Sequence, residues 1–471
     1  MLNRVFFIFI LFLAVAGPVA AQRKYITPNT DSGYYLGYPQ TSRLHPGDTL
    51  VLHARDAWSY FTVENYRGDP SRPLVIINEG GVVRFRIGIR LVNDSYIKLV
   101  GSGSSDPYGF LVEQDPGGRP LTGGAIQVGR RSKNIEVSRV NIHNCGIGFV
   151  CETNEDCADS LNYPNWVLDS ISIHHCRIVG IWNEGMYIGN TSPDNAADSY
   201  DPRPIECGGR KVYPMPMRNG NMRVYDNYVD STGRGGIQMA SASTGMSEIS
   251  HNTVRHCGLN GDGAQGTGIS VGTYTRVSIH DNIVSNTYTW GIASLGGSGT
   301  GTVLRIENNR IDSSGYLAHY RLANTEKYWI DPIREPVYPG ELAWPCAIEV
   351  GTRPTLFRDS TRFRISNNII GLYKSGKAAI QVQDKYRTLT HDGNIICGNT
   401  NAGNGKPVSV YIDRSNGDIR IADCSGLIRK AGWVEQLTAP IRHKRLILFG
   451  LAFVLVVGAG LYYFARGRRV A

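Results

Sequence analysis

One short pattern, close to I-x-I-x-x-N-x-(I/V), returns along most of this chain. It reads NMRVYDNYVDSTGRGGIQMAS at 221–241, SEISHNTVRHCGLNGDGAQGTGISVGT at 247–273 and RVSIHDNIVSNTYTWGIASLGGSG at 276–299, with further copies at 302–315 and 361–382. Each copy holds short stretches of alternating apolar and polar residues, the period of a β-strand, separated by a polar corner. A single copy cannot bury its apolar side, so copies must stack about 4.8 Å apart to form a core. The repeat therefore predicts an all-β solenoid of parallel strands.

Aligning the copies on their central asparagine predicts a buried ladder. Each amide would bond the equivalent amide on the next rung, which is a structural role rather than a chemical one. Two earlier segments, IEVSRVNIHNCG and SISIHHCRIVG, fit the same frame with Val140 and Cys176 in the asparagine position. The long gap between the fourth and fifth asparagines holds either one rung with a large insertion or two rungs. The predicted ladder consists of Asn227, Asn252, Asn282, Asn309, Asn368 and Asn394.

Both ends of the chain are predicted to be targeting segments. Residues 1–21 combine the basic Arg4, the apolar run VFFIFILFLAVAG and a small-residue exit, which predicts a signal peptide cleaved after Ala21. Residues 446–464, LILFGLAFVLVVGAGLYYF, are uncharged and long enough to cross a bilayer of about 30 Å as a helix. Equal numbers of basic residues flank this segment, so the positive-inside rule does not predict its orientation. The signal peptide predicts instead that the body lies outside and the basic tail, 465–471, inside. A cleaved sorting signal is the alternative to a stable anchor.

The net charge of +9 reflects these ends rather than the body. One unit belongs to Arg4 and six to Lys and Arg between positions 442 and 469, so residues 22–441 carry about +2. A nucleic-acid partner is therefore not expected. The nine cysteines suggest disulfides in an exported protein, and the spacing in CETNEDC allows Cys151 and Cys157 to close a short loop.

The repeats resemble the right-handed parallel β-helix, or pectin-lyase-like, superfamily over roughly residues 45–425. The opening HPGDTLVLHARDAWSYFTVENYRGDPSRPLVIINEGGVVRF (45–85) resembles the first rungs of the chondroitinase B and alginate lyase group. The ends of such a coil need covers, because exposed terminal strands promote aggregation. Residues 22–44 are therefore expected to cap the start, and residues 426–445 to form a second cap and linker, where GLIRKAGWVEQL has nearly helical apolar spacing. The group's calcium ligands and its Lys/Arg catalytic pair do not occur at recognisable spacing. Ca²⁺ is thus a candidate cofactor without assigned ligands.

A stripe of outward residues marks the candidate site. The strands after the long turns, as in AIQVG (125–129) or MYIGN (186–190), are rich in amide and aromatic groups at their centres, which suits sugar hydroxyls and ring faces. Excursions at 150–166 and 190–220 leave after this strand, and those at 255–267 and 316–345 arrive before it. They would flank a groove floored by Tyr187, Gln238 and Ser270. The candidate substrate-binding residues are Gln127, Gln238, Ser270, Asp262, Gln265 and Glu349.

Three residues of this region form the candidate catalytic set. Glu184 and Arg234 occur on adjacent rungs, so they would pair with each other or hold an acidic sugar. Tyr187 would stack on a sugar or donate a proton. A polysaccharide lyase needs such a base, acid and cation. The structural alternatives are a solvated ion pair of little energetic value and a packed ladder aromatic.

Two functions follow from this reading. The first is a monomeric, membrane-tethered protein that engages extracellular polysaccharide, with a lyase acting on uronate-containing glycan favoured over a hydrolase. Glu184 and Glu349 lie four rungs apart, about 19 Å, whereas a hydrolase needs carboxylates roughly 5–9.5 Å apart. The alternative is a non-catalytic glycan-binding, adhesive or structural β-helix on the cell surface.

Overall fold

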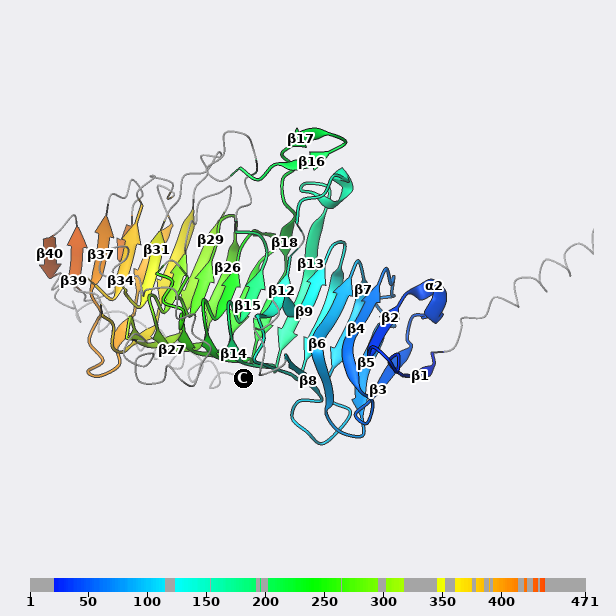
Figure 1. Cartoon of the computed structure of the whole chain (residues 1–471). Helices are drawn as coiled ribbons and strands as arrows, with labels where there is room; N and C mark the ends of the chain where they lie inside the picture. Colours follow the sequence, from blue (N-terminus) through cyan, green and yellow to red (C-terminus); the bar gives the residue numbers. More distant parts are fainter. Residues whose placement is uncertain are drawn as a thin grey trace, which may run out of the picture.

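The chain winds as a parallel β-helix whose strands line up in three stacks (Figure 1). This computed structural model describes residues 21–436 except 115–122, 153, 192–194, 196–201, 264, 295–301, 317–344, 352–360, 375–377, 385–388, 390–392, 414–418, 422–426 and 431–432. Successive rungs pair in parallel, as in β20 (Tyr228–Thr232) with β24 (Thr253–Cys257). The predicted all-β parallel β-helix is confirmed.

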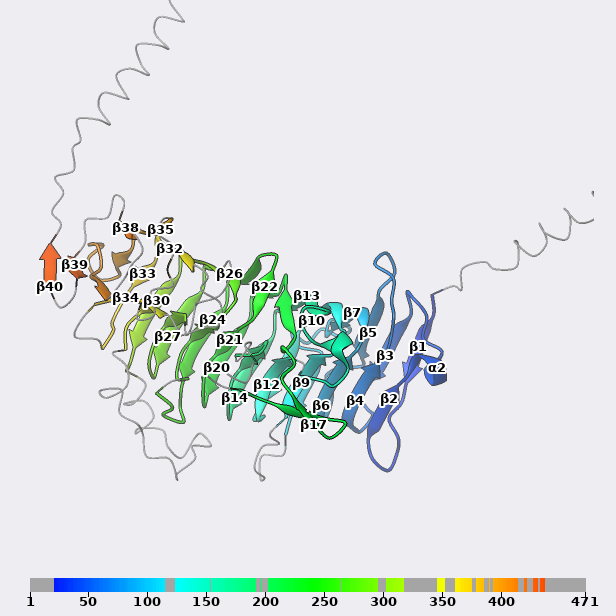
Figure 2. The same ribbon diagram turned by 90° about the horizontal axis from the view of Figure 1, so that it is seen from above.

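The first stack precedes the asparagine corner and is visible along its edge in Figure 2. It consists of β1 (Arg23–Ile26), β3 (Thr49–His53), β5 (Leu74–Glu79), β7 (Ser95–Val100), β10 (Lys133–Ser138), β13 (Val167–His174), β19 (Arg223–Tyr225), β23 (Ser247–Ser250), β26 (Arg276–His280), β29 (Val303–Glu307), β32 (Arg362–Ser366), β35 (Asn394–Cys397) and β38 (Ile419–Ile421), with β18 (Arg218–Gly220) and β22 (Ala242–Thr244) paired beside it.

The second stack follows the same corner. It consists of β8 (Phe110–Glu113), β11 (Val140–His143), β14 (Arg177–Ile181), β20, β24, β27 (Ile283–Thr287), β30 (Arg310–Ser314), β33 (Ile369–Ile370) and β36 (Thr400–Asn401).

The third stack completes each coil and carries the predicted site. It consists of β2 (Tyr34–Gly37), β4 (Trp58–Glu64), β6 (Val83–Val92), β9 (Gly124–Gly129), β12 (Ile147–Cys151), β15 (Met186–Ile188), β21 (Ile237–Met239), β25 (Ile269–Val271), β28 (Ile292–Ser294), β31 (Ile348–Gly351), β34 (Ile380–Gln383), β37 (Val410–Asp413), β39 (Leu427–Lys430) and β40 (Trp433–Gln436). The long strand β6 also pairs with β8 and so reaches into the second stack.

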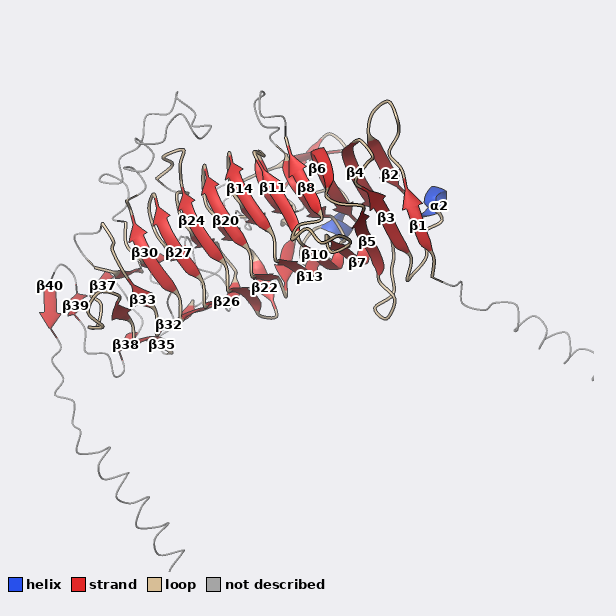
Figure 3. Ribbon diagram, turned by 90° about the horizontal axis from the view of Figure 1, so that it is seen from below, coloured by secondary structure: helices blue, strands red, loops and turns tan. Residues whose placement is uncertain are grey.

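Regular helix is confined to two short elements of the described chain, α2 (Pro39–Ser42) and the 3₁₀ turn η1 (Asp159–Leu161) (Figure 3). A small hairpin of β16 (Ile205–Cys207) and β17 (Arg210–Val212) projects from the coil. The helix expected from the apolar spacing at 426–437 is wrong, because β39 and β40 form an antiparallel pair there. This pair lies on the last parallel rung, β37, where it extends the sheet rather than covering it with a helix.

Inward residues of the three stacks merge into one continuous apolar core along the coil. The alternation predicts it: in β26 the burial of Val277 and Ile279 alternates with partly exposed Arg276, Ser278 and His280. Stacking each apolar side chain on its equivalent one rung away removes a large apolar area from water, at roughly 25 cal/mol per Å². Packing between rungs is therefore the main source of stability.

The asparagine ladder is confirmed for its first five members. Asn252 shows the pattern: its Nδ2 donates to Asn282 Oδ1 at 3.0 Å, and its Oδ1 accepts from the side chain of Asn227 at 3.0 Å. The amide also donates to Val224 O at 2.9 Å, so its buried polar atoms are satisfied. Asn309 bonds Asn368 directly at 2.9 Å. The long gap in the sequence is thus one rung with an insertion.

The sixth assignment was wrong, because the ladder continues through Asn399. Asn368 Nδ2 donates to Asn399 Oδ1 at 2.8 Å. Asn394 instead opens β35 and accepts the backbone N–H of Phe363 at 3.1 Å. The segment GNIICGN offers two asparagines, and only the second follows the strand by two residues, as in the other rungs. Val140 and Cys176 do occupy the equivalent position upstream, and Cys176 N donates to Asn227 Oδ1 at 3.0 Å.

The residue just before each ladder position adopts a left-handed conformation. His251, Asp281 and Asn308 have φ of 55°, 55° and 57°. Asn, Asp and His tolerate this region better than most side chains do. This corner turns the chain from the first stack to the second and projects a column of polar side chains outward.

The predicted disulfide between Cys151 and Cys157 is wrong. Cys157 is bonded to Cys207, whose Cα lies 5.6 Å from that of Cys157, while Cys151 is a free, buried thiol. Cys151 belongs to β12 and points into the core, so it is sterically unavailable to the loop that follows. The bridge instead joins the two excursions that leave the third stack.

No helix within the described ranges is long and apolar enough to span a membrane. The predicted signal peptide and the predicted span at 446–464 lie outside the described residues, apart from Ala21.

Candidate functional site

The outward stripe of the third stack has the predicted register, with one rung added. Val150 of β12 lies between Gln127 and Tyr187, a rung that the alignment of the sequence had omitted. The pairings then continue rung by rung to the C-terminal part of the coil. The full order is Gln127, Val150, Tyr187, Gln238, Ser270, Ala293, Glu349 and Gln381.

Only the N-terminal part of this stripe is open. Gln127 and Tyr187 are half-buried, whereas Gln238, Ser270 and Glu349 are 8%, 5% and 7% exposed. The groove floor predicted at Gln238 and Ser270 is therefore covered. Farther along, Trp290 and Cys346 pack against the outward Ala293.

The predicted ion pair between Glu184 and Arg234 is present. Arg234 Nη1 lies 3.4 Å from Glu184 Oε1, and Arg234 Nε lies 3.7 Å from Asp262 Oδ2. Glu184 is 3% exposed, so its carboxylate depends on this cation for compensation. Gln265 lies beside the cluster, its backbone N–H donating to Asp262 O at 3.2 Å. One guanidinium thus joins two carboxylates from different rungs.

Tyr187 lies next to this cluster and remains a phenol at neutral pH. Burial raises its pKa, and the negative charges of Glu152 and Glu184 raise it further. A hydrogen bond between its hydroxyl and Thr191 Oγ1, at 3.2 Å, has the opposite effect. This environment suits a proton donor better than a base.

Glu152 is a functional candidate that the sequence reasoning missed. Burial, followed by the charge of Glu155, raises the pKa of Glu152 to about 7, while Arg203 acts to lower it. Such a carboxyl is half-ionised near neutral pH, the condition for exchanging protons efficiently. The signal in the sequence was the omitted rung FVCE, which had been interpreted only as one side of a disulfide loop.

A pocket of about 420 Å³ opens beside Glu152 on the outer face of the third stack. Its polar lining includes two arginines and an amide, Arg90, Arg130 and Gln127, together with three acidic residues, Glu152, Glu155 and Asp156. Pockets of this size hold small molecules or single units of a polymer. The two arginines and the amide suit a carboxylate and neighbouring hydroxyls.

The walls beyond this pocket are fixed to each other. The Cys157–Cys207 bridge links the excursions 150–166 and 190–220. Tyr163 N donates to Met215 O at 3.1 Å, and the guanidinium of Arg218 lies 3.9 Å from the ring centroid of Tyr163. The structure therefore bears out that these two excursions lie together beside the stripe.

Glu349 is separate from this group. It pairs in register with Ala293 and Gln381, several rungs from Glu184. Burial raises the pKa of Glu349 to about 8, and its Oε2 has no hydrogen-bond partner in the described part of the chain. Its distance from Glu184 agrees with the argument against a hydrolase that uses this pair.

The carboxylates of the pocket do not form a cation site. Carboxylate oxygens are the ligands that Ca²⁺ prefers, but within the described ranges no three of them converge here to within 4.8 Å of one another. The residues present therefore do not fit a bound Ca²⁺, and no step is assigned to one.

No model of a protein family matches the chain, and no curated protein matches it. Among solved structures, it is similar to an alginate lyase from Paenibacillus sp. str. FPU-7, with 12% identity, 87% of this chain and 98% of that chain covered, and a TM-score of 0.39. It is also similar to a GH136 lacto-N-biosidase from Eubacterium ramulus, with 13% identity, coverage of 87% and 68%, and a TM-score of 0.41. Likeness at this level carries no argument about the site, and the fold rests on the strand pairings.

Proposed function

We propose that this chain engages a uronate-containing polysaccharide in the pocket beside Glu152 and cleaves it by β-elimination. The observation that carries the proposal is that Glu152, with a pKa of about 7, lines a pocket together with two arginines and is near enough to Tyr187 for its charge to raise the pKa of that phenol. Exchange of a proton at a carbon atom requires a group whose pKa lies near the working pH.

Each group has one part in this reaction. Arg90 and Arg130 pair with the uronate carboxylate and stabilise the negative charge that develops on it. Gln127 binds hydroxyl groups. The ion-paired Glu184 and Arg234 position the rungs beneath Tyr187 rather than contacting the reacting atoms.

The step balances without a further reactant. Ionised Glu152 takes the proton from C5 of the uronate, the C4–C5 double bond forms, and the C4–O glycosidic bond breaks. The hydroxyl of Tyr187 gives its proton to the departing oxygen. Solvent then carries the proton from Glu152 back to the phenolate, which restores both groups.

The location of the body is part of the same proposal. The signal-like residues 1–21 and the uncharged segment 446–464 support export and membrane anchoring, with the β-helix on the extracytoplasmic side. An extracellular polymer would then meet the open pocket from solution, with one copy of the chain sufficient for binding.

The test uses the full chain with a panel of acidic and neutral polysaccharides. We expect ultraviolet absorbance from the unsaturated uronate, at a rate that rises as the pH passes upward through about 7, because Glu152 must be ionised. Glu152→Gln and Tyr187→Phe should each lower turnover by about 10²–10⁴-fold while polymer binding persists. The matched control Tyr34→Phe changes an exposed residue of β2, which does not line the pocket, and should keep full activity.

One observation favours a second function, non-catalytic glycan binding. Arg234 is already compensated by Glu184 and Asp262, so the cation predicted to hold the substrate is not free. Polymer binding without unsaturated product or new reducing ends would establish this function and end the lyase proposal. Reducing ends without unsaturation would instead indicate hydrolysis.

A further inference from the structure

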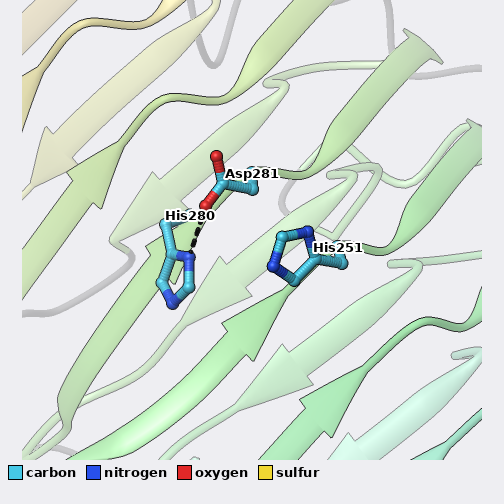
Figure 4. A group of neighbouring side chains, drawn as sticks. All are labelled: His251, His280 and Asp281. Atoms are coloured by element: carbon cyan, nitrogen blue, oxygen red, sulfur yellow. Dashed lines mark hydrogen bonds and ion pairs between the residues drawn. The ribbon is translucent and has the colours of Figure 1, made fainter.

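A cluster of metal-ligating side chains lies away from the pocket, at the corner between the first and second stacks. His251, His280 and Asp281 each offer one ligand atom, and these atoms all lie within 4.8 Å of one another (Figure 4). It is the one group of three such residues in the part of the chain that the structure describes.

The coil itself brings these residues together. His251 and Asp281 occupy the same left-handed corner position on successive rungs, and His280 ends the strand just before Asp281. The backbone N–H of His251 donates to His280 O at 3.2 Å, so the two rungs are fixed to each other at this point. The arrangement therefore follows from the backbone rather than from a chance meeting of long side chains.

The histidine at the centre is oriented as metal-ligating histidines usually are. His280 Nε2 lies 3.4 Å from Glu248 Oε1, and its Nδ1 lies 2.8 Å from Asp281 Oδ2. Glu248 is itself held by Ser250 Oγ at 2.7 Å and by Arg223 Nε at 3.4 Å. A carboxylate that accepts one imidazole N–H directs the other nitrogen toward a metal and fixes its tautomer.

His251 supplies the remaining imidazole. Its ring lies edge-on to that of His280, with centroids 5.9 Å apart, and it is exposed. Within the described residues, no hydrogen bond or ion pair involves its ring nitrogens. By contrast His175, at the same corner position two rungs earlier, already contacts His174 Nδ1 at 2.8 Å and Asp226 at 3.8 Å.

We propose that His251, His280 and Asp281 bind a divalent first-row transition metal ion, for which Zn²⁺ is the natural probe. Two imidazoles and one carboxylate are ligands that Zn²⁺ accepts, at about 2.0–2.2 Å, with a further position left for water. The ion replaces the proton between His280 Nδ1 and Asp281, and a small rotation of the exposed His251 completes the set. Glu248 stays hydrogen-bonded to His280 Nε2–H as its orienting partner.

Equivalent positions on other rungs show which side chains can replace the proposed ligands without disturbing the coil. Asn308 and Asn367 occupy the corner position of His251 with φ of 57°, and Ser250 and Ser366 lie in register with His280. His251→Asn and His280→Ser therefore remove ligands while keeping side chains that this coil already accommodates. His175→Asn is the matched control, since it makes the same change at the same corner on another rung.

The experiment is a calorimetric titration of ZnCl₂ into the metal-free full chain, purified without a histidine tag. We expect one saturable step that His251→Asn and His280→Ser each abolish, that Glu248→Gln weakens by about 10–100-fold, and that His175→Asn leaves unchanged. Co²⁺ in place of Zn²⁺ should give a visible absorption band with the same dependence, and circular dichroism confirms folding of each variant. No saturable step in the unaltered chain, or a step that survives both ligand substitutions, would overturn the proposal.

Discussion

On the outer face of the first stack, Glu136 lies between a histidine and a lysine from neighbouring rungs. The hydrogen bond from His174, and next the contact with Lys98 Nζ at 2.8 Å, lower the pKa of Glu136 to about 2. On the outer face of the third stack, burial raises the pKa of Glu152 to about 7 and that of Glu349 to about 8. All three carboxylates occupy outward positions of the same repeat.

The difference shows that a position in the repeat does not set the chemistry of the residue there. On the first stack, the neighbouring rungs supply cations and water reaches the side chain, so ionisation is favoured. On the third stack, desolvation of Glu152 and Glu349 outweighs the available partners, so the neutral acid is favoured. The burial of its carboxyl groups, rather than the geometry of the coil, makes the outer face of the third stack a candidate for acid–base chemistry.

The largest effect is expected from Glu349→Gln. A folded-state pKa near 8, against 4.5 in the unfolded chain, means that the folded protein binds more protons between these values, so stability falls as the pH rises through them. Replacing the carboxyl by an amide of the same shape should stabilise the fold by on the order of 3 kcal/mol at pH 8, with almost no change at pH 4. Urea unfolding at both pH values measures this. Equal effects at the two values would show that Glu349 is ionised without penalty.

A change of opposite sign is expected from Asn252→Ala, since this buried amide has all its partners. Its removal leaves donors and acceptors on neighbouring rungs unpaired, which should cost about 2 kcal/mol or more. The control is Asn141→Ala, an outward residue one position past the ladder, with an expected effect within about 0.5 kcal/mol. Thermal and urea unfolding compare them, and equal losses would remove the ladder's special role.

The smallest effect is expected from Glu136→Gln. Because its folded-state pKa is lowered to about 2, its contribution is present above the unfolded value of 4.5 and is lost as the pH falls from 4.5 to 2. The side chain is 29% exposed, so screening limits the contribution to about 1 kcal/mol at pH 7. Unfolding at low and high salt should show the difference shrinking with salt. A loss that is unaffected by pH and salt would point to packing instead.

The architecture could be predicted from the sequence because its cause is local and repeated. The alternation recurs along the coil and the asparagine in most rungs from Asn227 onward, so errors in one copy are corrected by the others. The prediction of the ladder was wrong at Asn394. GNIICGN contains two asparagines five residues apart, and nothing else in this short strand shows which of them belongs to the ladder. The helix expected at 426–437 was wrong because strands of four residues are too short to show the alternation that distinguishes them from a helix.

The site was predictable only where it follows the register. Glu184, Arg234 and Asp262 were brought together because adjacent rungs place them there. Glu152 was missed because its importance depends on burial by excursions that carry no repeat. The Cys157–Cys207 bridge was missed for the same reason, since the paths of two irregular segments decide it.

The bond from Asn309 to Asn368 has a consequence for how this protein can change. It joins residues that are 59 positions apart in the chain yet on neighbouring rungs. The strands β28 and β31 likewise pair directly, although the same insertion separates them in the sequence. The coil therefore closes over the inserted residues as though they were absent. Lengthening a loop already this long adds little to the entropy of closing it. New segments can therefore be inserted at this point, or old ones replaced, without changing how the neighbouring rungs pair.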